Sequence, residues 1–575
     1  MRSLSLPPPK KIGRGELLRA PSFFPGLALL YFTLLPLSNS LHAADTFNTD
    51  ICVFGGTSAG IIAAVEASRL GKSVVLLEPG THLGGMTSGG LGATDVGNPA
   101  AIGGLSREFY HRVALHYSRP EAWTEEDKSN YFARRAEHPV PPPDLGASNS
   151  VMWTFEPHVA AEVFQEMLTE AGVAVYRKQR LSAIRKSGTR LTEIRMENGN
   201  VFSAKMFIDA SYEGDLMARA GVTSRIGREA NAEYGETFDG TRTNATGHQF
   251  WVPVDSYKKP GVPQSGLLPG IQSEKPGTPG EADTRVQAYN YRLCLTDVPT
   301  NRLPIAPPPN YNPADYELPA RYLEALALAG QSPTLAYFWN ASTLPNRKLD
   351  VNNNGPFSTD FIGRSWNYPG AAYPARDGIA RAHEYYIRGL LTFLATSPRV
   401  PVSIHGEIQK WGLCKDEFIE NGGWPPQLYV REARRMVSDY VMAEKNCRGT
   451  EIVSDSVGLA SYNMDSHNCR RIVINGRVEN EGDVQVPVPK PYPISYRSLI
   501  PKQGQCENLL VPVCLSATHV AYGSIRMEPV FMEMGQAAGT AAGLALDQGV
   551  PVQQLGYGVL RARLLAERQI LDWTP

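Results

Sequence analysis

The stretch Ile51–Met86, ICVFGGTSAGIIAAVEASRLGKSVVLLEPGTHLGGM, decides the fold of this chain. It begins with an apolar run that ends in glycines and continues with a small-residue segment of helical pattern at Ala59–Leu70. A second apolar run follows at Ser73–Leu77. A strand, a helix and a second strand in this order form a βαβ unit, which builds a parallel sheet. The stretch therefore predicts an α/β fold with a Rossmann-like domain.

The glycines of this unit follow the dinucleotide-binding pattern. Gly55 and Gly60 match its first and third glycines, and Thr57 occupies the middle position. Such glycines make a tight turn and let the backbone approach a pyrophosphate, which then faces the helix N-terminus. Glu78 ends the second strand, where a carboxylate can accept hydrogen bonds from ribose hydroxyls. A plain structural turn is the alternative, but the whole pattern favours cofactor contacts at Gly55, Gly56, Thr57, Ala59, Gly60 and Glu78.

A second glycine pair follows directly, in Leu83-Gly84-Gly85-Met86. Many FAD enzymes continue with such a pair, which lets the chain cross the ribose and flavin of the cofactor, whereas NAD dehydrogenases do not need it. The alternative is an ordinary glycine loop. The pair favours FAD as the cofactor, with contacts from Gly84, Gly85 and Met86.

The segment Phe207–Leu216, FIDASYEGDL, places acidic residues after a third apolar run. We interpret it as a second turn near the ribose and pyrophosphate, with contacts from Asp209 and Asp215. A capped helix start is the alternative, because acidic side chains are favourable in the first turn of a helix.

A third segment, Ser516–Gly539, places His519 and Arg526 ahead of a small-residue helix that contains Gly535 and Gly539. A helix N-terminus at the pyrimidine edge of the flavin would stabilise negative charge on reduction. Close helix packing is the alternative explanation for the two glycines.

Oxidation of a carbon that bears a hydroxyl or an amine needs a base near flavin N5. His519 is the first candidate, because it precedes the predicted flavin-facing helix. His467, close to Asp465, is the second, and Arg526 completes the predicted catalytic set. A buried structural role is the alternative for either histidine.

Three parts follow from the distribution of these patterns. A discontinuous FAD-binding domain takes residues 45–225 and 491–575, and an inserted α+β substrate domain takes 226–490. Helices are expected at 157–171, 377–395, near 429–445 and at 529–548. The basic residues of Tyr429–Met436 form a solvated face or an ion-pair network or, alternatively, bind an anionic substrate such as a uronic acid.

The N-terminus has the pattern of an export signal. Basic residues precede the apolar stretch Phe23–Leu37, and small residues follow at Ser40–Ala44. We expect cleavage of residues 1–44 and a secreted or periplasmic protein without a membrane segment, the alternative being a retained anchor. The net charge of −1 and pI of about 6.8 do not favour nucleic acid, which leaves a small molecule as the expected partner.

No metal is expected. The seven cysteines include no CxxC pair and no closely spaced run of the kind that holds an iron–sulfur cluster. The chain contains no HExxH. Asp350–Gly355 matches half of a calcium loop, but Phe361 stands where a bidentate Glu is required. An Asn-rich turn at the mouth of the active site is the better interpretation of this segment.

The motifs GGTSAG, LGGM, FEPHVA, IDASYEGD, DVNNNGPFSTDF, YVREARRM, YNMDSH and RMEPVFMEMGQAAG together resemble a bacterial family of FAD-dependent oxidoreductases. Many of its members are secreted, and some are labelled xanthan lyase-like. The resemblance covers nearly all of residues 48–555. It implies a glutathione-reductase-type FAD fold with an inserted domain, and FAD contacts at Gly55, Gly60, Glu78, Gly84, Gly85 and the segment Arg526–Gly539.

The sequence thus predicts an exported FAD-dependent oxidoreductase that oxidises a small polar substrate, namely a sugar, polyol or glycoside, by hydride transfer to flavin. Oxidation of an amine or amino acid on the same fold is the first alternative. A polysaccharide lyase or carbohydrate-binding protein with a vestigial FAD site is the second.

Overall fold

A seven-stranded sheet carries the first domain. Its order is β3 (Ala174–Arg177), β2 (Val74–Glu78), β1 (Thr46–Phe54), β6 (Val201–Asp209), β5 (Arg190–Met196) and β4 (Leu181–Ser187), with β22 (Leu509–Leu510) also paired to β6. The strands from β3 to β6 and β22 are parallel, and β5 and β4 are antiparallel. The computed structural model describes residues 45–574 except 136–142 and 244, so the predicted leader lies outside the described residues.

The βαβ unit predicted from Ile51–Met86 is present. The last four residues of β1 pair with Val74–Leu77, and helix α1 (Ser58–Arg69) connects the two strands. Ile51–Phe54 are fully buried. Ile51 and Val53 pack in one core cluster with residues of α1, and Cys52 and Phe54 pack in a second cluster with residues of β4 and β5.

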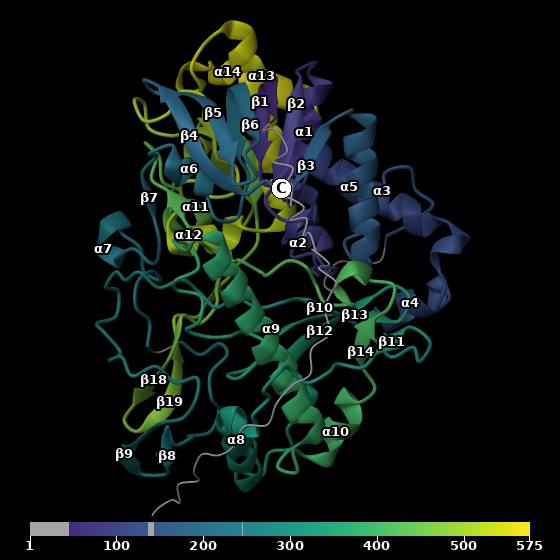
Figure 1. The fold of residues 1–575 in the computed structure, drawn as a ribbon, viewed down its shortest axis with the longest axis vertical. Helices are drawn as coiled ribbons and strands as arrows, with labels where there is room; N and C mark the ends of the chain where they lie inside the picture. The colour runs from purple at the N-terminus through teal and green to yellow at the C-terminus, as the bar shows by residue number, and fades with distance from the viewer. Residues whose placement is uncertain (1–44, 136–142, 244, 575) are drawn as a thin grey trace, which may run out of the picture. The chain divides into compact units, whose positions relative to one another are not determined.

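The C-terminal part of the chain returns to this domain, as predicted. Strand β22 pairs with the end of β6, next to the stretch of β6 that pairs with β5. Helix α13 (Glu528–Gln548) then packs along α1. Figure 1 shows α13, in yellow, beside the purple β1 and α1. The Rossmann-like domain is therefore built from both ends of the described chain.

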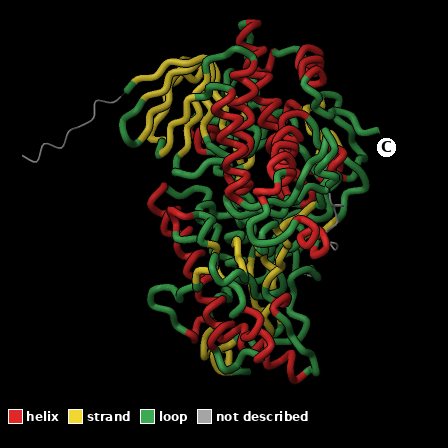
Figure 2. Tube along the Cα trace, turned by 90° about the vertical axis from the view of Figure 1, so that its right-hand side faces the viewer, coloured by secondary structure: helices red, strands yellow, loops and turns green. Residues whose placement is uncertain are grey.

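The inserted region contains a five-stranded sheet and several helices (Figure 1). The order of the sheet is β11 (Arg302–Leu303), β14 (Gly412–Cys414), β10 (Leu293–Thr296), β13 (Lys348–Asn353) and β12 (Trp339–Leu344). Two-stranded pairs are β7 (Ser224–Arg225) with β15 (Arg435–Met436), β8 (Tyr257–Lys259) with β9 (Val262–Leu267), β16 (Ser456–Ala460) with β21 (Tyr492–Ser495), β17 (Met464–Ser466) with β20 (Val484–Val486), and β18 (Arg470–Ile474) with β19 (Arg477–Glu481). Figure 2 shows long loops between these short elements.

The remaining α-helices are mostly short. They are α2 (Gly85–Ser88), α3 (Gly104–Ser118), α4 (Lys128–Arg134), α5 (Pro157–Glu170), α6 (Asp215–Arg219), α7 (Asn231–Tyr234), α8 (Glu317–Leu328), α9 (Tyr373–Thr396), α10 (Val402–Ile408), α11 (Glu444–Cys447), α12 (His519–Ile525) and α14 (Tyr557–Ala566). The predicted helices at 157–171, 377–395 and 529–548 are present as α5, α9 and α13. Within the described residues, no helix has the length and apolar character needed to cross a bilayer.

The prediction of a helix near 429–445 is wrong. The segment is extended, with the short strand β15 and a single turn at α11. Arg431 and Arg435 are buried there and donate hydrogen bonds to carbonyls of distant segments, those of Ala288 and Ala517. These tertiary contacts outweigh the helical pattern of the segment.

One further prediction is wrong in detail. The Asn-rich segment that begins at Asp350 is a strand, β13, rather than a turn. The seven cysteines are all buried free thiols. Cys294 and Cys414 face each other across β10 and β14 with their Sγ atoms 3.8 Å apart.

Candidate active site

The turn between β1 and α1 is built so that nothing larger than glycine fits at two positions. Gly55 has a φ of +105°, and a Cβ added there would lie 2.5 Å from the backbone nitrogen of Ser211. A Cβ on Gly60 would lie 1.9 Å from the carbonyl oxygen of Gly55. The turn therefore brings bare backbone to the N-terminus of α1, which is the arrangement that binds a phosphate.

Thr57, in the middle position of the motif, has a structural role. Its hydroxyl donates to the Ala210 carbonyl at 2.8 Å and accepts from the Gly60 N–H at 3.2 Å. It is thus the N-cap of α1 and ties the helix to the end of β6.

Glu78 lies next to this turn at the end of β2. Its carboxylate accepts hydrogen bonds from the N–H groups of Gly56 at 2.8 Å and Gly80 at 2.5 Å. Burial raises the pKa of Glu78 to about 7, although both N–H groups favour the charged form. The two backbone contacts fix the orientation of the carboxylate toward the adjoining cavity.

A cavity of about 210 Å³, here called the nucleotide cavity, opens at this turn. It is lined by six residues of the predicted cofactor set, namely Gly55, Gly56, Thr57, Glu78, Gly85 and Asp215. The other lining residues are outside the predicted set and include Arg180, Ser211, Tyr212, Glu213, Tyr373 and Arg376. Arg180, Tyr373 and Arg376 lie far from the motif in sequence, so no local pattern indicates them.

The glycine pair of the LGGM motif adopts positive φ angles, +96° at Gly84 and +55° at Gly85. A Cβ on Gly85 would lie 2.2 Å from the hydroxyl of Tyr212. That hydroxyl accepts from the Met86 N–H at 2.9 Å and donates to Glu528 at 2.7 Å. Tyr212 therefore connects the LGGM turn to the first residue of α13.

The other predicted cofactor residues do not line the nucleotide cavity. Ala59, Gly60, Gly84 and Met86 are buried and are not among its lining residues. Asp209 is fully buried and accepts from the N–H groups of Ser211 and Met217, which corresponds to the capping alternative. Asp215 lines the cavity, but its carboxylate also pairs with Arg376 and Arg434.

Gly535 and Gly539 face α1. A Cβ on Gly535 would lie 2.2 Å from the Ala59 carbonyl, and one on Gly539 would lie 2.6 Å from the Ala63 carbonyl. These glycines let two helices approach each other closely, which corresponds to the packing alternative.

A second cavity, of about 500 Å³, adjoins the first and is here called the substrate cavity. The two share a wall, because Tyr291 and Leu428 line the nucleotide cavity while their neighbours Arg292 and Tyr429 line the substrate cavity. The lining is rich in hydrogen-bonding side chains, among them Thr94, Asp95, Asn340, Ser342, Asn352, Ser461, Tyr462, Asn463, Asp465 and His467.

His467 is the predicted catalytic residue that lines the substrate cavity. Its Nδ1 lies 2.7 Å from Asp360, and its Nε2 lies 3.6 Å from a carboxylate oxygen of Asp465. Burial and the charge of Arg431 lower the pKa of His467, but the two carboxylates outweigh them and raise it above its ordinary value.

His519 lines neither cavity. Its ring is 1% exposed, with Nδ1 2.7 Å from Glu432 and Nε2 2.7 Å from the hydroxyl of Ser466. Both nitrogens are thus engaged in a buried network, which corresponds to the structural alternative. His467 differs from His519 in its partner, Asp360. This residue lies more than a hundred positions away in sequence, so no local pattern indicates the contact.

Arg526 supports the wall of the substrate cavity. It donates to the hydroxyl of Tyr429 and to the carboxylate of Asp465, both at 2.9 Å. The basic segment around Arg431 forms an ion-pair network rather than a solvated face, with Arg431 2.8 Å from Asp360.

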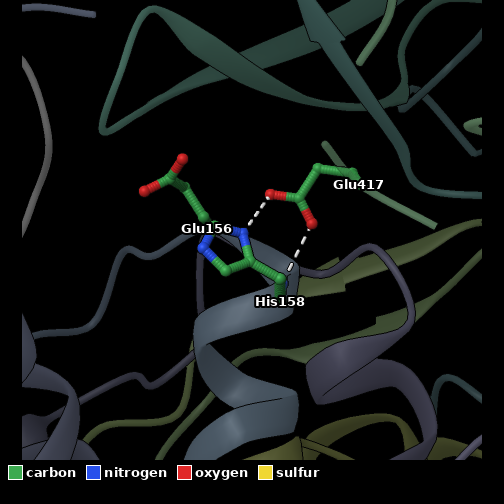
Figure 3. Close-up of side chains that lie close together, drawn as sticks. All are labelled: Glu156, His158 and Glu417. Atoms are coloured by element: carbon green, nitrogen blue, oxygen red, sulfur yellow. Dashed lines mark hydrogen bonds and ion pairs between the residues drawn. The ribbon is translucent and has the colours of Figure 1, made fainter. Parts of the chain in front are cut away.

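One further cluster has the residue types of a metal site, formed by Glu156, His158 and Glu417 (Figure 3). His158 Nδ1 lies 2.7 Å from Glu417. The ammonium of Lys348 lies 2.8 Å from Glu156 and 2.7 Å from Glu417, so it already supplies the positive charge that these carboxylates need.

The chain is similar over most of its length to one family. The family's sequence model, described as FAD dependent oxidoreductase, matches residues 50–564. A β-cyclopiazonate dehydrogenase from Aspergillus oryzae is 30% identical over 100 residues, which are 16% of this chain and 22% of that protein. The chain thus matches about a fifth of the length of this curated relative.

Similar solved structures cover a third of the chain. An L-amino acid deaminase from Proteus vulgaris has 17% identity and a TM-score of 0.23, over 32% of this chain and 53% of that one. An L-proline dehydrogenase from P. horikoshii has 17% identity and a TM-score of 0.22, over 32% and 59%.

The nucleotide cavity fits the cofactor of this family. Its backbone turn excludes any Cβ where a pyrophosphate approaches, and Glu78 presents a carboxylate for ribose hydroxyls. The family match extends over nearly the whole of the described chain. The protein therefore belongs to the FAD dependent oxidoreductase family and is an enzyme with FAD as its cofactor.

Proposed function

We propose that this enzyme oxidises a hydroxyl-bearing carbon of a sugar, polyol or glycoside, with His467 as the base. One observation carries the proposal, namely that a cavity lined by hydroxyl, amide and carboxylate groups contains His467 beside the nucleotide cavity. FAD, when bound, would supply the acceptor for the hydride that leaves the substrate carbon with its two electrons. The hydroxyl proton goes to His467.

The contacts of His467 suit a base. Hydrogen bonding of Nδ1–H to Asp360 fixes the ring and leaves the lone pair of Nε2 to accept a proton. Asp465 lies 3.6 Å from Nε2, beyond hydrogen-bond distance, and stabilises the charged ring once the proton has moved. The base must be neutral before it acts, so the rate rises with pH through the pKa of His467.

The lining favours a substrate with several hydroxyl groups. The hydroxyl of Tyr462 lies 3.1 Å from Asp95, and the side-chain amide of Asn290 donates to Asn352 at 3.0 Å behind the surface. Each polar group that a hydroxyl satisfies contributes selectivity, since a substrate that lacks the hydroxyl leaves a buried polar atom unpaired.

The test is the reduction of enzyme-bound FAD in the absence of oxygen by the His467→Gln variant. The matched control is His116→Gln, at a half-buried position of α3 that lines neither the nucleotide cavity nor the substrate cavity. We expect the His467 variant to remain yellow but to bleach about 10²- to 10⁴-fold more slowly, and to lose the rise of rate with pH. The control should bleach at the wild-type rate. Bleaching of the His467 variant at that same rate would exclude this histidine as the base.

A substrate panel separates the other reactions. We expect sugars, polyols or glycosides to bleach the flavin. Bleaching by amino acids or amines alone would identify the first alternative reaction. Formation of unsaturated uronate products without any bleaching would identify a lyase, and would contradict the proposed oxidation.

We further propose that the enzyme is a secreted bacterial protein whose partner is this small molecule. The basic, apolar and small-residue order of the first 44 residues supports export. N-terminal sequencing of the protein recovered from the producing cells tests the proposal, with a mature start after Ala43 or Ala44 as the expected result. An intact N-terminus in the cytoplasmic fraction would contradict it.

A further inference from the structure

A third cavity, of about 410 Å³, lies within the inserted region and shares no lining residue with the nucleotide or substrate cavity. We propose that it is a second binding site, which takes a small ligand made of a ring that bears a carboxylate group. The loop Pro308–Tyr316, the segment Phe357–Arg364, helix α9 and Arg471 form its walls. We call it the aromatic cavity.

Aromatic rings form much of the wall. Phe361 and Tyr386 stack with centroids 4.1 Å apart and planes at 3°, and Tyr316 continues the stack at 24° to Tyr386. Phe357 and Tyr385 also line the cavity. Ring faces in this arrangement offer a stacking surface to another flat ring, or to the apolar face of a sugar ring.

Arg471 supplies a positive charge to this wall. It is 2% exposed, and it donates from Nε to Asn480 at 3.0 Å and from Nη2 to the Pro356 carbonyl at 2.7 Å. Among the described residues, no Asp or Glu forms an ion pair with it, and its Nη1 makes no hydrogen bond. A Cβ added to Gly270, which lines the cavity, would lie 3.4 Å from that Nη1.

Arg471 lies over the Phe357 ring, 4.7 Å from its centroid, but a buried charge without a carboxylate partner is still costly. Other buried arginines of the described chain have such a partner. Arg228, Arg292 and Arg435 each lie within 2.8 Å of a carboxylate. Burial without such a partner lowers the pKa of Arg471 to about 10. A ligand carboxylate at Nη1 would supply the missing negative charge and a charge-assisted hydrogen bond.

Charges at the rim favour the same ligand. The guanidinium of Arg364 lies 5.6 Å from the Phe361 ring centroid at the exposed edge. Asp315, an exposed carboxylate that also lines the cavity, has the opposite effect, because it repels an anion. Two guanidinium groups thus face one solvent-screened carboxylate, which leaves the cavity net positive.

The rings and the buried cation together define the ligand class. A neutral ring would leave Nη1 of Arg471 without a carboxylate, and an inorganic anion would leave the ring faces uncovered. Two sources share the required chemistry, an aromatic acid and a glycuronic acid. The experiment distinguishes them with 4-hydroxybenzoate and D-glucuronate as probes, and with 4-hydroxybenzamide and D-glucose as their neutral counterparts.

Titration calorimetry on the full FAD-loaded protein tests the proposal. We expect one of the two acids to bind, and its neutral counterpart and inorganic phosphate to bind at least roughly tenfold more weakly. In Arg471→Gln the affinity for the acid should fall roughly tenfold to a hundredfold, and in Tyr385→Ala it should fall several-fold. Arg477→Gln, on the exposed part of β19, is the matched control and should bind as the wild type does.

The proposal is overturned if neither acid binds the wild type, if phosphate binds as well as the acid, or if Arg471→Gln and Tyr385→Ala both bind with unchanged affinity. Because Arg471 is buried, circular dichroism must first show that its variant folds. If it does not, Tyr385→Ala and Arg364→Gln decide the question, since both lie outside the fully buried core. Loss of affinity in both supports the site, and unchanged affinity in both overturns it.

Discussion

At the scale of single residues, Gly60 shows how little space the cofactor turn leaves. A methyl group there would lie 1.9 Å from the Gly55 carbonyl, which is backbone and cannot move aside cheaply. We expect Gly60→Ala to lower the free energy of unfolding by about 3 kcal/mol and to yield colourless protein. Urea unfolding and the flavin absorption spectrum measure both effects.

Gly406 provides the control for this substitution. It lies in helix α10, and an added Cβ would have no neighbour within 4 Å. Gly406→Ala should keep its flavin and gain about 0.5–1 kcal/mol, because alanine loses less backbone entropy in a helix. Equal behaviour of the two variants would contradict the close approach at the turn.

His158 gives a prediction for pH. Burial lowers its pKa, but the hydrogen bond and charge of Glu417 outweigh burial and raise it to about 9, from 6.5 in an unfolded chain. The folded state therefore binds the proton more tightly, and this stabilisation is complete below pH 6.5 and lost as the pH rises through about 9.

We expect His158→Gln to be less stable than the wild type at pH 6, by roughly 1 kcal/mol after allowance for solvent screening, and equally stable at pH 10. Urea unfolding of the variant and the wild type at pH 6, 8 and 10 measures the difference. A stability gap that stays constant across this range would show that the charge of His158 does not contribute.

The same scale shows what sequence can and cannot predict about the site. Gly55, Gly60 and Glu78 were predictable, because the turn needs them at fixed spacing within one unit. The choice between His467 and His519 was not predictable. It depends on Asp360 and Glu432, which reach the two rings only through the tertiary fold.

At the scale of elements, the contact between α1 and α13 is graded along its length. An added Cβ meets backbone at 2.2 Å from Gly535 and at 2.6 Å from Gly539, but only the Leu70 side chain at 2.9 Å from Gly543. Because a side chain can rotate and backbone cannot, we expect alanine at these positions to lower Tm most at 535, less at 539 and least at 543.

Scanning calorimetry of protein saturated with FAD and of protein stripped of it tests this order. If the glycines serve helix packing, both forms give the same ranking. If they serve the cofactor, as the other sequence interpretation has it, the ranking disappears in the stripped protein.

Local pattern predicted the elements whose partners are near in sequence. Helices α5 and α9 each have an apolar stripe of their own. The helix prediction for segment 429–445 was wrong because Arg431 and Arg435 form ion pairs with Asp360 and Glu229, which lie on other segments. A helical pattern alone does not reveal such partners.

At the scale of the whole molecule, one hydrophobic core extends through the first domain and the inserted region. Ile51 of β1, Leu293 of β10, Leu390 of α9 and Val513 belong to the same buried cluster. We therefore expect a single thermal transition in calorimetry for residues 45–575, and no stable fold for the excised segment 226–490. Two separate transitions, or a soluble folded fragment, would contradict a shared core.

Sequence predicted the fold class and the discontinuous first domain, because one βαβ unit and a returning strand and helix define them. It did not predict the order of the five-stranded sheet, in which β14 lies between β10 and β11 although it follows both by about a hundred residues. The substrate cavity could not be predicted from sequence either, since its walls come from segments near residues 95, 292, 350, 429 and 465.

The late arrival of α13 has a consequence for biosynthesis. Helix α1 emerges from the ribosome early, but the glycine face that covers it is made only after residue 548. Until then the turn between β1 and α1 is present without the helix that packs against α1. The apolar side of α1 is therefore exposed to chaperones or to premature association. Cofactor loading is thereby postponed to a late stage of translation or beyond, so a ribosome that stops early leaves a chain that cannot hold flavin.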